Sequence, residues 1–60
     1  MFTDNQKAEL ANLKNWFPYR IVFGVIDSAT GEFSAYAKTT MHTANNLARK
    51  GHLVAIFNRA

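Results

Sequence analysis

The feature that most constrains this chain is a short turn between two segments that favour β-structure. Residues 27–32 read DSATGE: the Asp27 side chain can accept hydrogen bonds from nearby backbone N–H groups, and Gly31 can take a positive φ without steric cost. Residues 19–27 are rich in β-branched and aromatic side chains, and residues 32–38 continue beyond the turn. The sequence therefore predicts a β-hairpin.

A helix is expected before the hairpin. Thr3 and Gln6 have the spacing of a capping box, in which a hydroxyl and an amide satisfy the first free backbone N–H groups. The apolar positions that follow recur at helical spacing: Leu10, Leu13 and Phe17. Pro18 disfavours helical geometry in the residue before it, so the helix is expected to end near residue 15 or 16.

A second helix and a last strand are expected after the hairpin. Thr39 or Thr40 can cap this helix, and Gly51 fits the left-handed residue that ends it. Its buried stripe is predicted to hold Met41, Ala44, Leu47 and Ala48. Residues 53–58 are predicted to form the third strand.

These elements predict one α+β domain that spans residues 1–60, in the order α-β-β-α-β. A helix joins the second and third strands, so a crossover within one sheet runs them parallel. The first strand is apolar at nearly every position, which is typical of a central strand. We therefore expect a three-stranded antiparallel sheet in the order 2-1-3, with two helices.

The register of the hairpin decides which side chains share a face of the sheet. If Asp27 lies opposite Glu32, one face carries Val22, Gly24, Ile26, Phe33, Ala35 and Ala37. The small residues of this face leave room for close packing, so both helices are assigned to it. The other face then carries Tyr19, Ile21, Phe23, Val25, Ser34, Tyr36 and Lys38.

That second face is the leading candidate for a binding surface. An uncovered apolar patch on a soluble protein usually marks an interaction site. The predicted contact consists of Ile21, Phe23, Val25 and Tyr36, with Lys38 and Arg20 at its rim. We expect this surface to pair with a second copy in a homodimer, or with another protein. The alternative is that the N-terminal helix covers this face and produces a three-layer monomer.

A nucleic-acid-binding function is the second hypothesis. Aromatic side chains beside basic ones can stack single-stranded bases, and the formal net charge is +3. The second helix adds side chains that can contact bases or phosphates: Asn45, Asn46, Arg49 and Lys50.

Several classes of function are not expected. The 60 residues contain no cysteine, and the two histidines, His42 and His52, are ten positions apart, so no disulfide, metal or cofactor is predicted. Asp27 and Glu32 could pair as carboxylates, but a solvated turn with a capping Asp explains them better. His42 lies among three threonines that helix capping explains, and no third group orients it, so an enzyme with a small-molecule substrate is not expected. No apolar run is long enough for a signal peptide or a membrane span, so a cytoplasmic protein is expected.

In length and element order, residues 19–59 resemble several very small bacteriophage proteins that bind and block host machinery. Examples are a phage inhibitor of bacterial RNA polymerase and a phage antitoxin against host RNA-cleaving toxins. The resemblance implies a host protein as partner. It rests on no diagnostic motif and assigns no residue, and the N-terminal helix and the basic charge depart from those proteins.

Overall fold

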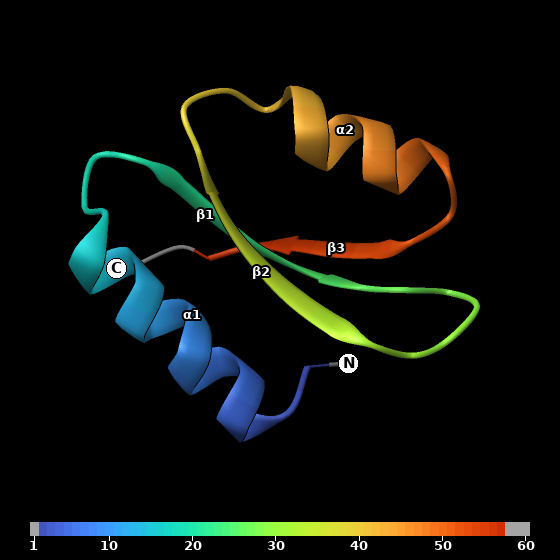
Figure 1. Cartoon of the computed structure of the whole chain (residues 1–60), viewed down its shortest axis with the longest axis horizontal. Helices are drawn as coiled ribbons and strands as arrows, with labels where there is room; N and C mark the ends of the chain where they lie inside the picture. The colour runs from blue at the N-terminus through green and yellow to red at the C-terminus, as the bar shows by residue number, and fades with distance from the viewer. Residues whose placement is uncertain (1, 58–60) are drawn as a thin grey trace.

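The computed structural model describes residues 2–57, which form five elements (Figure 1). They are α1 (Asp4–Trp16), β1 (Ile21–Ile26), β2 (Phe33–Lys38), α2 (His42–Arg49) and β3 (Leu53–Ile56). The predicted α+β class and the order α-β-β-α-β are confirmed. The expected end of the last strand, Asn58, lies outside the described residues.

The sheet has the predicted order, β2-β1-β3, and both neighbouring pairs are antiparallel. The hairpin also has the predicted register. The Asp27 N–H donates to the Glu32 carbonyl at 2.9 Å, and the Gly31 N–H donates to the Asp27 carbonyl at 2.8 Å. Gly31 has a φ of +76°, which glycine adopts without a Cβ clash. The turn therefore sets the pairing of the whole hairpin, from Ile26 opposite Phe33 onward.

The predicted capping box opens α1. The Gln6 N–H donates to the Thr3 hydroxyl at 3.2 Å, and the Thr3 N–H donates to the Gln6 side-chain oxygen at 2.9 Å. The helix ends at Trp16, as expected from Pro18, and the Phe17 N–H closes it on the Leu13 carbonyl at 2.9 Å. Both ends of α1 follow from local sequence chemistry.

The C-terminal end of α2 agrees with the sequence prediction, and its N-terminal end does not. Gly51, with a φ of +94°, follows the helix as expected. The predicted threonine cap is wrong: Met41 occupies the N-cap position, and no side chain caps the helix there. Thr39 and Thr40 instead lie in the bend that carries the chain from the end of β2 to α2.

α1 packs on the face of the sheet that contains Gly24. A Cβ atom on Gly24 would lie 2.9 Å from Cε1 of Phe33 and 3.1 Å from Cδ1 of Leu10, well inside normal contact distance. Cε1 of Phe2 would lie equally close, at 3.1 Å. The absence of a side chain at Gly24 therefore lets α1 approach this face of the sheet.

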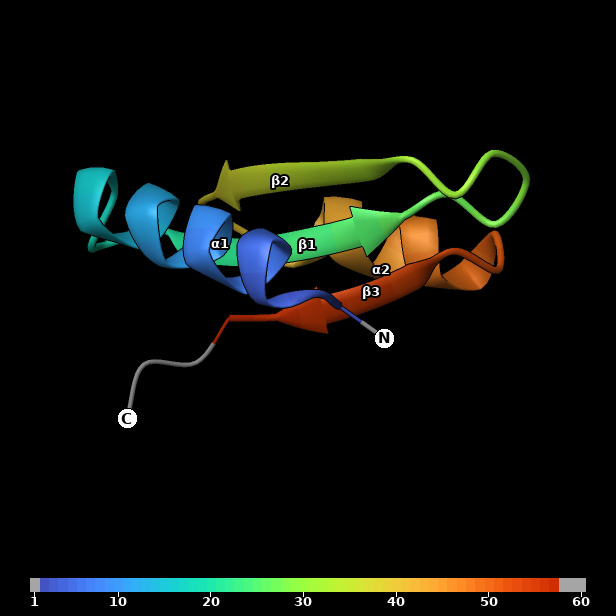
Figure 2. The ribbon, with the colours of Figure 1, turned by 90° about the horizontal axis from the view of Figure 1, so that it is seen from below.

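α2 covers the opposite face, so the molecule has three layers (Figure 2). The core on this face consists of Phe23, Val25 and Ala44, with four partly buried residues around it: Ile21, Tyr36, Leu47 and Val54. The prediction that both helices share the Gly24 face is wrong for α2. The alternative prediction of three layers is confirmed, but α2, and not the N-terminal helix, covers the Phe23 face.

Candidate functional site

The apolar sheet face predicted as a binding surface is filled by α2. Phe23 is fully buried and Val25 is 5% exposed. The Phe23 ring stacks on Tyr36 with 5.3 Å between centroids, and Ile21 packs against the same core. The prediction that these four side chains form an uncovered face is therefore wrong. Of the predicted contact residues, only Arg20 and Lys38 are exposed.

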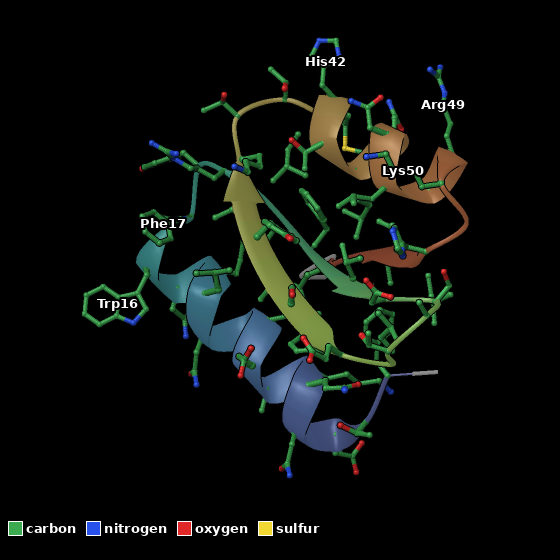
Figure 3. The ribbon with its side chains drawn as sticks, turned by 45° about the vertical axis from the view of Figure 1, so that its right-hand side comes forward. Trp16, Phe17, His42, Arg49 and Lys50 are labelled. Carbon is green, nitrogen blue, oxygen red and sulfur yellow. The ribbon has the colours of Figure 1, made fainter. Side chains whose placement is uncertain are left out.

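The structure exposes a different aromatic group, at the connection between α1 and β1. Trp16 is 78% exposed, Tyr19 is 98% exposed and Phe17 is 42% exposed. Pro18 separates the last two, and the chain turns outward there as α1 ends. In Figure 3, Trp16 and Phe17 project from the C-terminal end of α1. We call these three residues the aromatic corner.

Two cations, Lys14 and Arg20, lie at the aromatic corner, and Lys38 lies on the neighbouring strand. The Arg20 guanidinium carbon lies 5.7 Å from the centroid of the Phe17 ring, within cation–π range. The Lys14 ammonium donates to the Arg20 carbonyl at 2.8 Å, which ties the last turn of α1 to the start of β1. Lys38 lies on the neighbouring strand, opposite Ile21, with its ammonium 5.9 Å from the Tyr36 ring. Aromatic rings and positive charges therefore lie together at this end of the molecule.

Three of the four acidic side chains lie toward the other end. Phe2, just before α1, contacts Phe33 edge-to-face at 5.9 Å, which places the start of α1 beside the hairpin turn. Asp4 therefore lies near that turn, which contains Asp27 and Glu32. β1 has six residues, so its two ends are about 20 Å apart, more than twice the Debye length of about 8 Å in physiological salt. Screening therefore separates these three carboxylates from the cations of the aromatic corner, and Glu9 lies between the two ends, in the middle of α1.

The polar residues of α2 form a separate group. Asn45, Asn46, Arg49 and Lys50 are all exposed, and Figure 3 shows Arg49 and Lys50 at the C-terminal end of the helix. The Ser28 N–H donates to His52 Nδ1 at 3.2 Å, so this end of α2 lies beside the hairpin turn. The structure thus separates the basic end of α2 from Arg20 and Lys38, which the nucleic-acid hypothesis had combined.

Asp27 and His52, two of the candidate catalytic residues, make hydrogen bonds within the hairpin turn or to it. The Ala29 and Thr30 N–H groups donate to the Asp27 carboxylate at 2.7 and 3.1 Å, and these bonds lower the pKa of Asp27 below its ordinary value. His42 is exposed at the start of α2, and His52 is half-buried against the turn. Residues 2–57 contain no pocket and no group of three potential metal ligands.

Sequence reasoning missed the aromatic corner. The helical spacing places Phe17 with Leu10 and Leu13, the register places Tyr19 on the candidate sheet face but outside its predicted contact, and Trp16 has no predicted role. One pattern identifies the corner: three aromatic residues within four positions, interrupted by Pro18 and bounded by Lys14 and Arg20. Apolar rings at a helix end that breaks at proline lie beyond the last turn that packs on the sheet.

No protein family model, curated protein or solved structure matches this sequence. The resemblance to small phage proteins therefore stays a prediction. Within residues 2–57, no helix is long and apolar enough to cross a membrane.

Proposed function

We propose that this chain is a non-enzymatic binding protein whose aromatic corner binds single-stranded nucleic acid. The observation that supports this most directly is the grouping of exposed rings with Lys14, Arg20 and Lys38, at the end of the sheet opposite Asp4, Asp27 and Glu32. Proteins that bind single strands combine aromatic rings, on which bases stack, with cations that follow the phosphates.

The chemistry of the corner favours a single strand over a duplex. Trp16 and Tyr19 present exposed rings, and a ring can stack only on a base whose face is free. Duplex recognition would need a basic helix or ribbon that enters a groove. The basic helix end, with Arg49 and Lys50, lies by the hairpin turn instead.

The same corner gives a rough expectation for affinity and salt dependence. Stacking contributes about 1–3 kcal/mol per base, so two rings and a few phosphate contacts correspond to a dissociation constant on the order of micromolar at low salt. Neutralising up to three phosphates of a single strand gives a slope of about −2 for log K against log salt.

The alternative ligand of the aromatic corner is a protein, either a host protein or a second copy of this chain. Exposed tryptophan, tyrosine and arginine side chains commonly dominate protein contacts, and an acidic protein surface would meet the same cations. Because α2 covers the aromatic residues predicted as a contact on the sheet face, a protein partner would also have to bind at the aromatic corner. The experiment below separates the two.

Titration with a fluorescein-labelled 12-nucleotide strand, DNA or RNA, tests the proposal by anisotropy in about 20 mM salt. Trp16 is the only tryptophan, so quenching of its emission reports stacking at the corner itself. Trp16→Ala and Tyr19→Ala are each expected to weaken binding by about fivefold or more. A 12-base-pair duplex is expected to bind more weakly than the single strand.

A charge-matched pair of variants localises the site. Arg20→Ala is expected to weaken binding by several-fold, whereas Lys50→Ala, which also removes one positive charge, changes it by less than about twofold. Equal losses in both variants would move the site to α2. Absence of binding and of quenching at low salt would refute the proposal, and the aromatic corner would then be the first surface to probe for a protein partner.

A further inference from the structure

The outer edge of β2 is an open edge of the sheet. β2 lies at one end of the order β2-β1-β3, and Figure 2 shows its outer side along the top of the view, with no element of the described chain above it. The Asp27–Glu32 hydrogen bond fixes the alternation of the ladder, so Ser34, Tyr36 and Lys38 direct their backbone groups toward β1. The N–H and C=O groups of Phe33, Ala35 and Ala37 therefore point outward.

This edge has few of the features that prevent strand pairing. Edge strands are commonly protected by proline, a bulge, a central charge or a covering element. β2 contains no proline, and its six residues pair with β1 without a bulge. Its charges lie only at the ends: Lys38 is the last residue of the strand, and Glu32 comes just before the first.

We propose that β2 pairs antiparallel with β2 of a second copy, with Ala35 on the two-fold axis, to form a continuous six-stranded sheet. In this register Ala35 faces Ala35 of the second copy, and Phe33 faces Ala37 of the second copy. All the outward backbone groups of the two strands then pair with one another. The proposal shares one residue, Lys38, with the nucleic-acid surface, and its test does not depend on nucleic-acid binding.

Charge complementarity selects this register. With Ala35 on the axis, Lys38 lies opposite Glu32 of the second copy, in a non-hydrogen-bonded pair where side chains approach most closely. Both side chains are exposed on the α2 side of the sheet, and symmetry makes the pair occur twice. A shift of two residues in one direction places Lys38 opposite Thr30, and a shift in the other places it opposite Ser34. Both shifts lose the two ion pairs.

The helices leave room for the second copy. α1 packs over β1 and β2 together, so its axis lies about one strand spacing, or roughly 5 Å, from the two-fold axis. The two α1 helices would be roughly 10 Å apart, at the upper end of the 8–10 Å of close helix packing, so they can pack side by side without overlapping. α2 packs beside β3, on the far side of the sheet from this edge. The side chains that meet on the α1 face are small at Ala35 and Ala37.

Charge reversal tests the pairing by sedimentation velocity from 10 µM to 1 mM protein. The wild-type chain is expected to show a dimer whose fraction rises with concentration. Glu32→Lys and Lys38→Glu each place like charges opposite one another twice, and each is expected to weaken the dimer by on the order of tenfold. An equimolar mixture of the two variants restores both ion pairs, so it is expected to dimerise more strongly than either variant alone.

A backbone variant tests the edge itself. The Ala35 N–H points away from β1, so Ala35→Pro removes a hydrogen bond of the dimer without removing one from the hairpin. This variant is expected to remain monomeric to 1 mM with unchanged far-ultraviolet circular dichroism. In the wild-type dimer, the Ala35 and Ala37 amides gain protection from hydrogen exchange, while the Ser34 and Tyr36 amides are protected in monomer and dimer alike.

Several outcomes would overturn the pairing. A wild-type chain that is monomeric at 1 mM would do so, as would a mixture of charge variants that dimerises no better than its components. Dimerisation that survives Ala35→Pro but is lost in Trp16→Ala would place the contact at the aromatic corner instead. Because the readout is association of the protein alone, its failure leaves nucleic-acid binding untouched, and failure of nucleic-acid binding leaves the dimer untouched.

Discussion

Replacement of Phe23 tests whether α2 covers the second face of the sheet. The Phe23 side chain is fully buried, with the Tyr36 ring on one side and Ala44 in the same core. Phe→Ala changes in such sites cost about 3–5 kcal/mol, from lost burial and from the cavity that remains. A domain of 60 residues has roughly 3–9 kcal/mol of stability in total. We therefore expect Phe23→Ala to lose at least about a third of the stability, and to be largely unfolded at 25 °C where the total is at the lower end of this range.

A milder variant keeps the measurement within range. Phe23→Leu removes the equivalent of one or two methylene groups, so its expected cost is about 1–2 kcal/mol. Urea unfolding followed by circular dichroism gives this difference as a lower midpoint with an unchanged slope. The matched control is Trp16→Ala, which removes a larger ring that is exposed, with an expected change within about 0.5 kcal/mol. If Phe23→Leu matched the wild-type chain, Phe23 would lie on an open face and α2 would not pack there.

Two further predictions concern Gly24 and Asp27. Gly24→Val adds a side chain where α1 and the Phe33 ring approach Gly24 most closely, so it is expected to lower the free energy of unfolding by about 1–3 kcal/mol. The control, Ser34→Val at an exposed strand position, is expected to change it by less than about 0.5 kcal/mol. Equal effects of the two variants would contradict the packing of α1. Because the pKa of Asp27 is lower in the folded chain than its ordinary 3.8, its carboxylate contributes stability above that value and loses it as the pH falls through the folded pKa. Urea midpoints between pH 7 and pH 2.5 are expected to lack this loss in Asp27→Asn, and parallel pH profiles of the two proteins would count against the hydrogen bonds of the turn.

The elements whose ends depend on neighbouring residues could be predicted from the sequence. The capping box at Thr3, the helix end before Pro18 and the turn from Asp27 to Glu32 each involve atoms within a few positions of one another. The sheet order also followed, because a strand with apolar side chains on both faces must lie in the middle. These inferences needed no knowledge of how distant elements pack.

The faces chosen by the two helices could not be read from side-chain size alone. The small residues around Gly24 led to the prediction that both helices pack on that face, yet α2 packs over the larger Phe23. Chirality supplies the missing reason. β2 and β3 run parallel, and the connection between them through α2 is right-handed, as such crossovers almost always are. That handedness assigns α2 to one face and leaves the Gly24 face to α1. The sequence-based binding surface failed for the same reason.

The central position of β1 has a consequence for the rate and order of folding. Ile26 pairs with Phe33, seven positions ahead, and with Leu53, twenty-seven positions ahead. Closing the longer loop costs about 1.2 kcal/mol more in chain entropy, before the stiffness of α2 is considered. The hairpin can therefore form within microseconds, whereas the pairing of β3 with β1 is slower because it closes a longer loop. Mutations within the turn should slow refolding, whereas mutations in β3 should mainly accelerate unfolding.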